Sequence, residues 1–290
     1  MRRNSPLFFI ALLTGALLLA GCNPNPTPEE ACAPGPNGGN PVIIVAGTFS
    51  PAIANELFLG NSLQAAGFTH CVFELKGSDN FGNLPGTMPI DISAVALSLF
   101  VDEVLEWAGA TEVDLVGHSQ GALAARAYVK SWGGAPKVDK LVSLAGPNDG
   151  TDVVPLVDFL TLPLLAPFGV TCDGVWPCVQ MRRGSDFLTD LNSGGMTPAG
   201  VDYYAFYTNN DELVWYWGEG LFGLPVIKFD NATLGPGATN IEIGEMCPLR
   251  IVGHLGMILD PVPIHMTIDA LRGDPVDVPL ALCLLPPVPV

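Results

Sequence analysis

Ser119 lies in a Gly-x-Ser-x-Gly pattern that spans residues 117–121. The pattern alone is weak support for chemistry, but a β-branched apolar run at residues 113–116 precedes it and a helix-forming run at residues 122–130 follows it. A sharp turn between a strand and a helix would strain this serine, point its hydroxyl away from the sheet and set it among backbone N–H groups. We therefore predict that Ser119 is a nucleophile; the alternative is a glycine-flanked turn without chemistry. We expect the adjacent His118 to pack behind the turn, because neighbouring side chains in a tight turn diverge.

A serine hydroxyl becomes an effective nucleophile when a histidine removes its proton and a carboxylate holds the resulting imidazolium. Where the serine sits in such a strand-to-helix turn, the acid and then the histidine follow it in the chain. Only His254 and His265 follow Ser119. His254 comes after a strand-like run at residues 250–252, whereas His265 lies inside an apparent helix. We predict that His254 is the base and that His265 is structural.

Asp211 is the carboxylate that we predict to orient the base. It follows a strand-like run and the turn residues Asn209 and Asn210, which is the position expected of a carboxylate at the end of a strand. Other carboxylates compete with it for this role, and each could instead be an exposed, solvated group: Asp202, Glu212 and Asp230.

The elements that must position these residues alternate between strands and helices. We expect strands at residues 42–46, 71–75, 113–116, 140–144 and 203–207, and another near 241–243 or 250–252. We expect helices at residues 91–107, capped by Asp91, and at 122–130 and 264–271. This alternation predicts one α/β domain over residues 41–285, with a mostly parallel central sheet covered by helices on both faces.

Composition agrees with a large core and restricts the partners. Of 290 residues, 49% are hydrophobic and only 14% are charged, which excludes a collagen, a coiled coil and a disordered tail. The formal net charge of −17 repels phosphate backbones, so we expect no nucleic-acid partner.

The N-terminus has the pattern of an export signal. Arg2 and Arg3 precede an apolar run at residues 7–20 that is too short to span a bilayer. The tetrapeptide Leu-Ala-Gly-Cys at residues 19–22 resembles the bacterial lipobox, which implies a lipoprotein signal peptide over residues 1–21 and a membrane anchor on lipidated Cys22. The alternative is an ordinary signal peptide and a secreted protein. Residues 22–40, rich in Pro, Gly and Asn, are expected to form a tether.

Six further cysteines follow Cys22, and an even number in an exported protein suggests disulfides, with fifteen possible connectivities. No Cys-x-x-Cys pattern or His beside a cysteine pair supports a zinc site, so we expect no metal.

Four segments together resemble a known family. They are Ile-Ile-Val-Ala-Gly-Thr at residues 43–48, the serine turn at 117–121, Asp-Glu-Leu-Val at 211–214 and His-Leu-Gly at 254–256. The chain from about residue 32 to residue 283 is similar to the secreted α/β-hydrolase lipases, in particular the bacterial class-2 triacylglycerol lipases and the yeast lipase B group. The resemblance implies the α/β-hydrolase fold.

The resemblance also assigns residues. It implies that Thr48 and Gln120 form an oxyanion hole through their backbone N–H groups, with the Thr48 hydroxyl as a further candidate donor. It implies the disulfides Cys32–Cys71 and Cys247–Cys283. Cys172 and Cys178 have no counterpart in the family, and a Cys172–Cys178 bond would close a local loop.

The expected function is that of a monomeric serine ester hydrolase, a lipase or esterase, which acts on lipophilic esters through an acyl-enzyme without a cofactor. An apolar, Pro-interrupted segment at residues 153–170 is either a lid or acyl-pocket wall, or a core segment. Trp215, Trp217 and Phe222 either line the same pocket or pack in the core. Alternatives on the same triad are a polyester depolymerase and a phospholipase or acyltransferase; an alternative of another class is an inactive surface binding protein.

Overall fold

The computed structural model describes residues 26–152 and 175–286. The expected signal peptide, lipidated Cys22 and candidate lid at residues 153–170 lie outside the described residues, as does Cys172 of the candidate Cys172–Cys178 bond.

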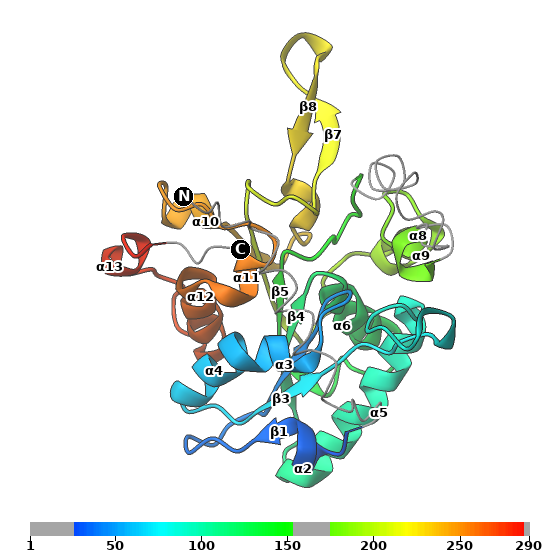
Figure 1. Cartoon of the computed structure of the whole chain (residues 1–290), viewed down its shortest axis with the longest axis vertical. Coiled ribbons are helices and arrows are strands. Elements are labelled where there is room, and N and C mark those ends of the chain that lie inside the picture. Colours follow the sequence, from blue (N-terminus) through cyan, green and yellow to red (C-terminus); the bar gives the residue numbers. More distant parts are fainter. Residues whose placement is uncertain (1–25, 153–174, 287–290) are drawn as a thin grey trace, which may run out of the picture.

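A seven-stranded sheet forms the centre of the molecule (Figure 1). Its strands run in the order β1-β3-β2-β4-β5-β6-β9, and all neighbours are parallel except the antiparallel pair β1 and β3. The strands are β1 (Cys32–Ala33), β2 (Val42–Val45), β3 (His70–Phe73), β4 (Val113–His118), β5 (Val138–Leu144), β6 (Asp202–Tyr207) and β9 (Ala238–Glu242). The expected α/β-hydrolase fold class, with a mostly parallel sheet, is confirmed.

Helices cover both faces of this sheet, and the apolar side chains of β2 divide between the two faces. Ile43 and Val45 pack in one core cluster with the helices α5 (Ile90–Ala108) and α6 (Gln120–Ser131). Val42 and Ile44 pack in a second cluster with η1 (Glu56–Gly60), α4 (Asn61–Ala65), α11 (Gly256–Leu259) and α12 (Pro261–Arg272). Because both faces of the strand are buried, its sequence is a continuous apolar run rather than an alternating one.

The longest helix among the described residues, α5 (Ile90–Ala108), buries apolar residues at the three- and four-residue spacing of one helix face. It ends at Gly109, which adopts the left-handed conformation (φ 62°) that favours glycine. The other helices on the sheet and at its ends are α2 (Pro28–Ala31), α3 (Ala52–Asn55), η1 (Glu56–Gly60), α4 (Asn61–Ala65), η2 (Asp79–Phe81), α6 (Gln120–Ser131), α8 (Trp176–Gln180), α9 (Asp186–Asn192), η6 (Asp230–Ala232), α10 (Ile243–Met246), α11 (Gly256–Leu259), α12 (Pro261–Arg272) and α13 (Leu280–Cys283).

One sequence prediction of local structure is corrected, and one pair of alternatives is decided. Asp91 does not cap α5, because the helix begins one residue earlier and the Ile90 N–H donates instead to the Gln180 side chain at 2.7 Å. Of the two positions expected for a further strand, 241–243 and 250–252, the structure favours the first: β9 covers Ala238–Glu242, and residues 250–252 are not in a strand. The buried Arg250 side chain instead binds the Asp260 carboxylate, with N–O distances of 2.7 Å.

The expected tether over residues 22–40 extends too far along the chain, because part of it is folded. From Pro28 the chain forms α2 and then β1, which pairs with β3. Cys32 is disulfide-bonded to Cys71, so this part of the chain is fixed to the sheet. The second disulfide joins Cys247 to Cys283. Both bonds are those that the family resemblance implies. Among the helices of the described residues, none has the length and hydropathy needed to cross a bilayer.

A two-stranded hairpin projects from one end of the molecule (Figure 1, top). It consists of β7 (Tyr216–Glu219) and β8 (Pro225–Lys228), antiparallel and joined through η5 (Leu221–Gly223). The chain enters it shortly after Asp211.

Candidate active site

The turn between β4 and α6 holds Ser119 in a strained backbone conformation, with φ 54° and ψ −125°. Its N–H donates to the Leu144 carbonyl of β5 at 2.9 Å. A Cβ atom at Gly117 would lie 2.5 Å from the Ala122 Cα, and one at Gly121 would lie 2.1 Å from the Val45 carbonyl oxygen. Only glycine fits at both positions, and the strain at a non-glycine residue between them is typical of a functional residue.

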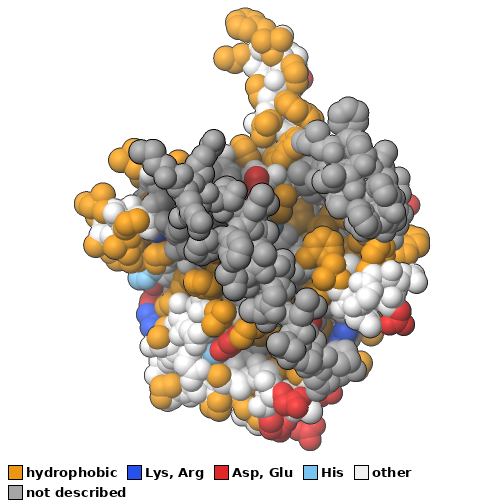
Figure 2. All heavy atoms as spheres, viewed as in Figure 1, with side chains coloured by type: hydrophobic (Ala, Val, Ile, Leu, Met, Phe, Trp, Pro, Cys, Tyr) orange, Lys and Arg blue, Asp and Glu red, His pale blue; other side chains and the backbone are white. Residues whose placement is uncertain are grey.

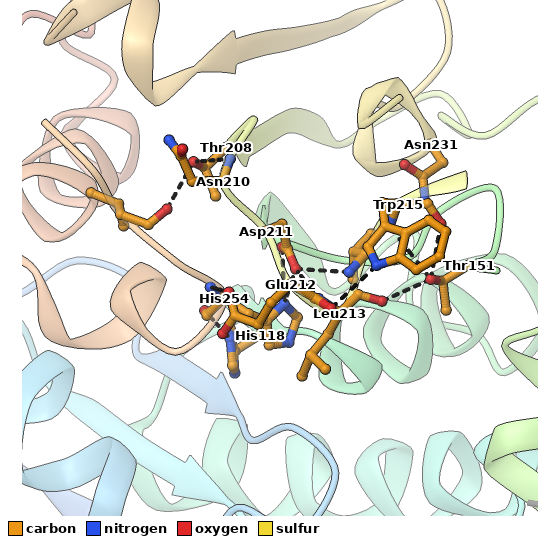
Figure 3. A network of polar contacts seen from close by, with 12 residues as sticks. His118, Thr151, Thr208, Asn210, Asp211, Glu212, Leu213, Trp215, Asn231 and His254 are labelled. Atoms are coloured by element: carbon orange, nitrogen blue, oxygen red, sulfur yellow. Dashed lines mark hydrogen bonds and ion pairs between the residues drawn. The ribbon is translucent and has the colours of Figure 1, made fainter. Parts of the chain in front are cut away.

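Asp211 and His254 lie in contact, although 43 positions separate them in the chain. The His254 Nδ1 is 2.9 Å from Asp211 Oδ2 and 3.0 Å from Oδ1 (Figure 3). The Oδ1 atom also accepts the N–H groups of Leu213 and Val214, at 2.8 and 2.7 Å. Both side chains are buried, so the carboxylate is held in place by the loop that carries it and in turn orients the imidazole.

The backbone of His254 is held from both sides. Its N–H donates to Glu212 Oε2 at 2.9 Å, and its carbonyl accepts from His118 Nε2 at 3.1 Å (Figure 3). The imidazole rings of His118 and His254 lie 4.9 Å apart. His118 packs behind the serine turn, but it also links that turn to the loop of the predicted base. Sequence reasoning did not find this contact, and it considered Glu212 only as a rival acid.

His118 is a neutral donor. Burial, and then the neighbouring His254, lower the pKa of His118 to about 3. Its Nδ1 is buried without a hydrogen-bond partner among the described residues, which agrees with the proton on Nε2.

The turn of Ser119 is therefore linked to the loop of His254 by His118, which precedes the serine in the chain. Among the described residues the Ser119 hydroxyl makes no hydrogen bond to the His254 imidazole. A nucleophile and its base often close this contact only when substrate binds.

Thr48 and Gln120 flank the serine. Thr48 follows Gly47, where a Cβ atom would lie 3.2 Å from the Ser119 Cβ, and Gln120 is the first residue of α6. Within the described part of the chain, neither backbone N–H donates a hydrogen bond. The Thr48 hydroxyl donates to Gln120 Oε1 at 2.5 Å and so links the two residues; it is not a free third donor.

The other sequence candidates lie apart from this arrangement. His265 lies on α12, with its Nε2 3.6 Å from Asp269 Oδ2. Asp202 and Asp230 are exposed. Trp215 is buried, but Trp217 and Phe222 are exposed on the hairpin, so the expectation that all three line a pocket or pack in the core is wrong for these two.

Metal ligands do not gather at the site. Within residues 26–152 and 175–286, no group of three or more His, Cys, Asp or Glu side chains could hold a metal ion.

The chain is similar to known lipases. The sequence model of the family described as "Lipase (class 2)" matches residues 39–232. Among solved structures, Aspergillus fumigatus lipase B has 22% identity and a TM-score of 0.64, over 89% of this chain and 62% of that one. Bacillus licheniformis lipase BlEst2 in its propeptide form has 15% identity and a TM-score of 0.61, over 86% of this chain and 54% of that one. The chain thus spans 62% and 54% of the lengths of these two proteins, and the likeness to them shows a shared fold.

Proposed function

Because the chain belongs to the class 2 lipase family, we propose that it is a serine hydrolase of lipophilic carboxylic esters, with triacylglycerols as the first substrates to test. One observation carries the proposal: the buried Asp211–His254 pair is fixed against the strained turn of Ser119. A histidine oriented by a carboxylate beside a serine turn supports catalysis by a serine nucleophile.

In the proposed reaction, the Ser119 hydroxyl attacks the ester carbonyl carbon while His254 Nε2 takes its proton. Asp211 holds the imidazolium through Nδ1. The N–H groups of Thr48 and Gln120 donate to the oxyanion of the tetrahedral intermediate, and each such donor lowers the barrier by about 3 kcal/mol. The intermediate expels the alcohol, which receives the proton from His254. Water then attacks the acyl-enzyme by the same route and releases the carboxylic acid.

The test is a chain-length series of p-nitrophenyl esters hydrolysed by the wild type and by alanine variants. Ser119→Ala and His254→Ala should each lower kcat by about 10³-fold or more and leave the melting temperature close to that of the wild type. His265→Ala, which removes the other candidate histidine, should keep its activity.

Two outcomes would overturn the assignment. An active His254→Ala enzyme with an inactive His265→Ala enzyme would place the base elsewhere. A wild-type protein that neither hydrolyses these esters nor is labelled at Ser119 by a fluorophosphonate would indicate an inactive scaffold. Triacylglycerol, phospholipid and polyester substrates, with and without an alcohol acceptor, distinguish the activities that share this triad.

We also propose that the protein is an exported lipoprotein that acts as a monomer. Its single catalytic domain, expected over residues 41–285, also includes the helix α2 and the strand β1 that precede residue 41. The two disulfides are consistent with export, because such bonds persist in oxidising compartments. Labelled palmitate should be incorporated into the wild type and not into Cys22→Ala, and a wild-type protein that remains unlabelled would contradict the anchor.

A further inference from the structure

The tip of the β7–β8 hairpin exposes large apolar side chains to solvent. Leu221 is 83% exposed, Phe222 98% and Leu224 64%. On the strands, Trp217 and its cross-strand partner Ile227 are 56% and 48% exposed. Figure 2 shows the hairpin standing out from the body of the molecule with hydrophobic side chains along it. Soluble proteins seldom expose so many large apolar groups together unless they bind something.

The tip is free of charged and polar side chains. Residues 220–227 read Gly-Leu-Phe-Gly-Leu-Pro-Val-Ile, and the nearest charges are Glu219 and Lys228 at the two ends of this run. Phe222 adopts a left-handed conformation, with φ 60° and ψ 22°. A bulky residue is disfavoured there, so the turn holds an exposed phenyl ring at the expense of backbone strain.

The backbone of the turn is hydrogen-bonded within itself. The Gly220 N–H donates to the Leu224 carbonyl at 2.7 Å, the Gly223 N–H to Gly220 and the Leu224 N–H to Leu221, both at 3.3 Å. Backbone polar groups that enter an apolar phase must be paired internally, and these donors are. Three of the five backbone donors of residues 220–224 can therefore leave water already paired, whereas the N–H groups of Leu221 and Phe222 donate no hydrogen bond within the described residues.

The end of the hairpin that joins the body of the molecule is fixed to the candidate active site. The Trp215 carbonyl accepts the Asp152 N–H at 2.9 Å, and the Trp217 N–H donates to the Asp152 carboxylate at 2.9 Å. Val214, next to Trp215, donates its N–H to Asp211. A surface that received the tip would lie on the side of the molecule that carries the proposed acid.

The shape and charge of the hairpin indicate what kind of surface its tip binds. Opposite residues of an antiparallel pair share a face, so Trp217 and Ile227 lie on one face and Val226 on the other. A rigid protein surface would cover one face, whereas a fluid apolar phase surrounds both faces and the tip. The net charge of −17, and Glu219 beside the turn, disfavour an anionic membrane.

We propose that the β7–β8 hairpin is an anchor that inserts its tip into the surface of aggregated, uncharged ester lipid. This inference rests on the proposed function, because it takes the aggregated substrate as the surface. Glu219 stays at the water boundary and limits insertion to the turn, and Trp217 lies at the boundary, where tryptophan is favoured.

The experiment measures flotation with triolein emulsion droplets in the inactive Ser119→Ala background, so that binding is scored without hydrolysis. The double variant L221S/F222S should lower the partition coefficient between droplets and water by about 100-fold, because two large side chains no longer leave water. The matched control is L99S/L280S, which removes two exposed leucines from α5 and α13; it should float like its parent.

A second measurement separates the anchor from the proposed chemistry. With Ser119 restored, L221S/F222S should hydrolyse a dissolved short-chain ester like the wild type and emulsified triolein far more slowly. A wild type that is inactive on the dissolved ester overturns the proposed function, while the flotation result still decides the anchor.

Three outcomes would overturn the anchor. One is equal flotation of L221S/F222S and L99S/L280S. Another is binding to anionic phospholipid vesicles in preference to triolein. The third is a dimer in sedimentation that L221S/F222S dissociates, with no binding to triolein, because the tip would then pack against a second copy of the chain.

Discussion

The backbone N–H and carbonyl of His254 are each hydrogen-bonded to a residue that is next in the chain to one of the other two members of the proposed triad. Glu212 follows Asp211 in the chain, and His118 precedes Ser119. A hydrogen bond to each side of His254 therefore ties its loop to the acid loop and to the serine turn at once. Displacements of about 1 Å lower rates by about 100-fold, so these contacts should matter to turnover.

Removal of the Glu212 carboxylate tests this positioning role. Glu212→Ala should lower kcat tenfold to about 100-fold with KM unchanged, because the His254 N–H loses its acceptor. Glu212→Gln keeps an acceptor oxygen and should restore most of kcat. Glu245→Ala, which removes another exposed carboxylate, is the control and should match the wild type. Equal losses in the Ala and Gln variants would refute the role.

The low pKa of His118 predicts that this residue does not shape the pH dependence of activity above pH 4. Because burial lowers the pKa of His118 to about 3, this residue stays neutral at pH 4 and above. His118→Gln, which keeps a side-chain N–H donor, should therefore leave the shape of the kcat/KM profile unchanged above pH 4. A pH–rate profile from pH 4 to 9 makes the comparison; a profile whose shape differed from that of the wild type would show that His118 titrates in this range.

At the scale of elements, the approach of α6 to β2 and β4 forms the serine turn. The helix begins at Gln120 immediately after Ser119, and Gly121 leaves no space between its Cα and the Val45 carbonyl. The glycines are needed because the backbone of one element meets the backbone of another, which no side-chain movement can relieve.

A methyl group at this contact should therefore be highly destabilising. Gly121→Ala should lower the free energy of unfolding by about 3 kcal/mol or more, because its Cβ would lie 2.1 Å from a backbone oxygen. Gly235→Ala is the matched control, since its Cβ would lie 3.7 Å from the nearest atom, the Met196 Cβ. Urea unfolding of the two variants measures the difference, and similar midpoints would show that the turn tolerates the methyl group.

The strand β4 also contains a buried carboxylate away from the serine turn. Burial raises the pKa of Asp114 to about 7, against the opposing effect of Lys140. In the unfolded chain this group titrates near pH 4, so between pH 4 and 7 the folded state binds more protons. The stability that Asp114 contributes is present below about pH 4 and is lost as the pH rises through about 7.

Asp114→Asn should remove this pH dependence. At pH 8 the variant should be more stable than the wild type by up to about 4 kcal/mol, and at pH 4 the two should be similar. Asp274→Asn removes an exposed carboxylate and serves as the control for net charge. Melting temperatures across this range measure the effect; a variant with no advantage at pH 8 would contradict it.

At the scale of the whole molecule, long-range bonds fix the loop that carries His254. Cys247 is bonded to Cys283 near the end of the described chain. Between the cysteine and the histidine, the buried Arg250 binds Asp260 and donates to the carbonyls of Leu282 and Leu285. This loop is thus tied to the C-terminal segment as well as to the active site.

The two disulfides should differ in their effect on activity. They close loops of 36 and 39 residues, so C247S/C283S and C32S/C71S should each lower the free energy of unfolding by about 4 kcal/mol in the chain-entropy account. At temperatures below the unfolding transition, only C247S/C283S should also lower kcat. The Cys32–Cys71 bond lies at the sheet edge formed by β1 and β3, so its loss should leave kcat unchanged. Equal kcat values would show that the loop of His254 does not need this bond.

Local patterns in the sequence were sufficient to predict the fold class and the turn of Ser119. The spacing of apolar residues predicts strands and helices, and a strand-to-helix turn needs glycines at fixed positions near the serine. Chain order reduced the choice of base to two histidines, and the ends of strands suggested Asp211. These inferences depend on residues that are neighbours in the chain.

The partnerships between distant residues were decided by the tertiary structure. It brought Asp211 to His254, made Glu212 a partner of the His254 backbone rather than a rival acid, and linked His118 to the same loop. It also placed Trp217 and Phe222 in solvent, because the hairpin projects from the molecule instead of folding back on it. An apolar residue carries the same hydrophobicity whether it is buried or exposed; only the packing of the remaining chain determines which of these it becomes.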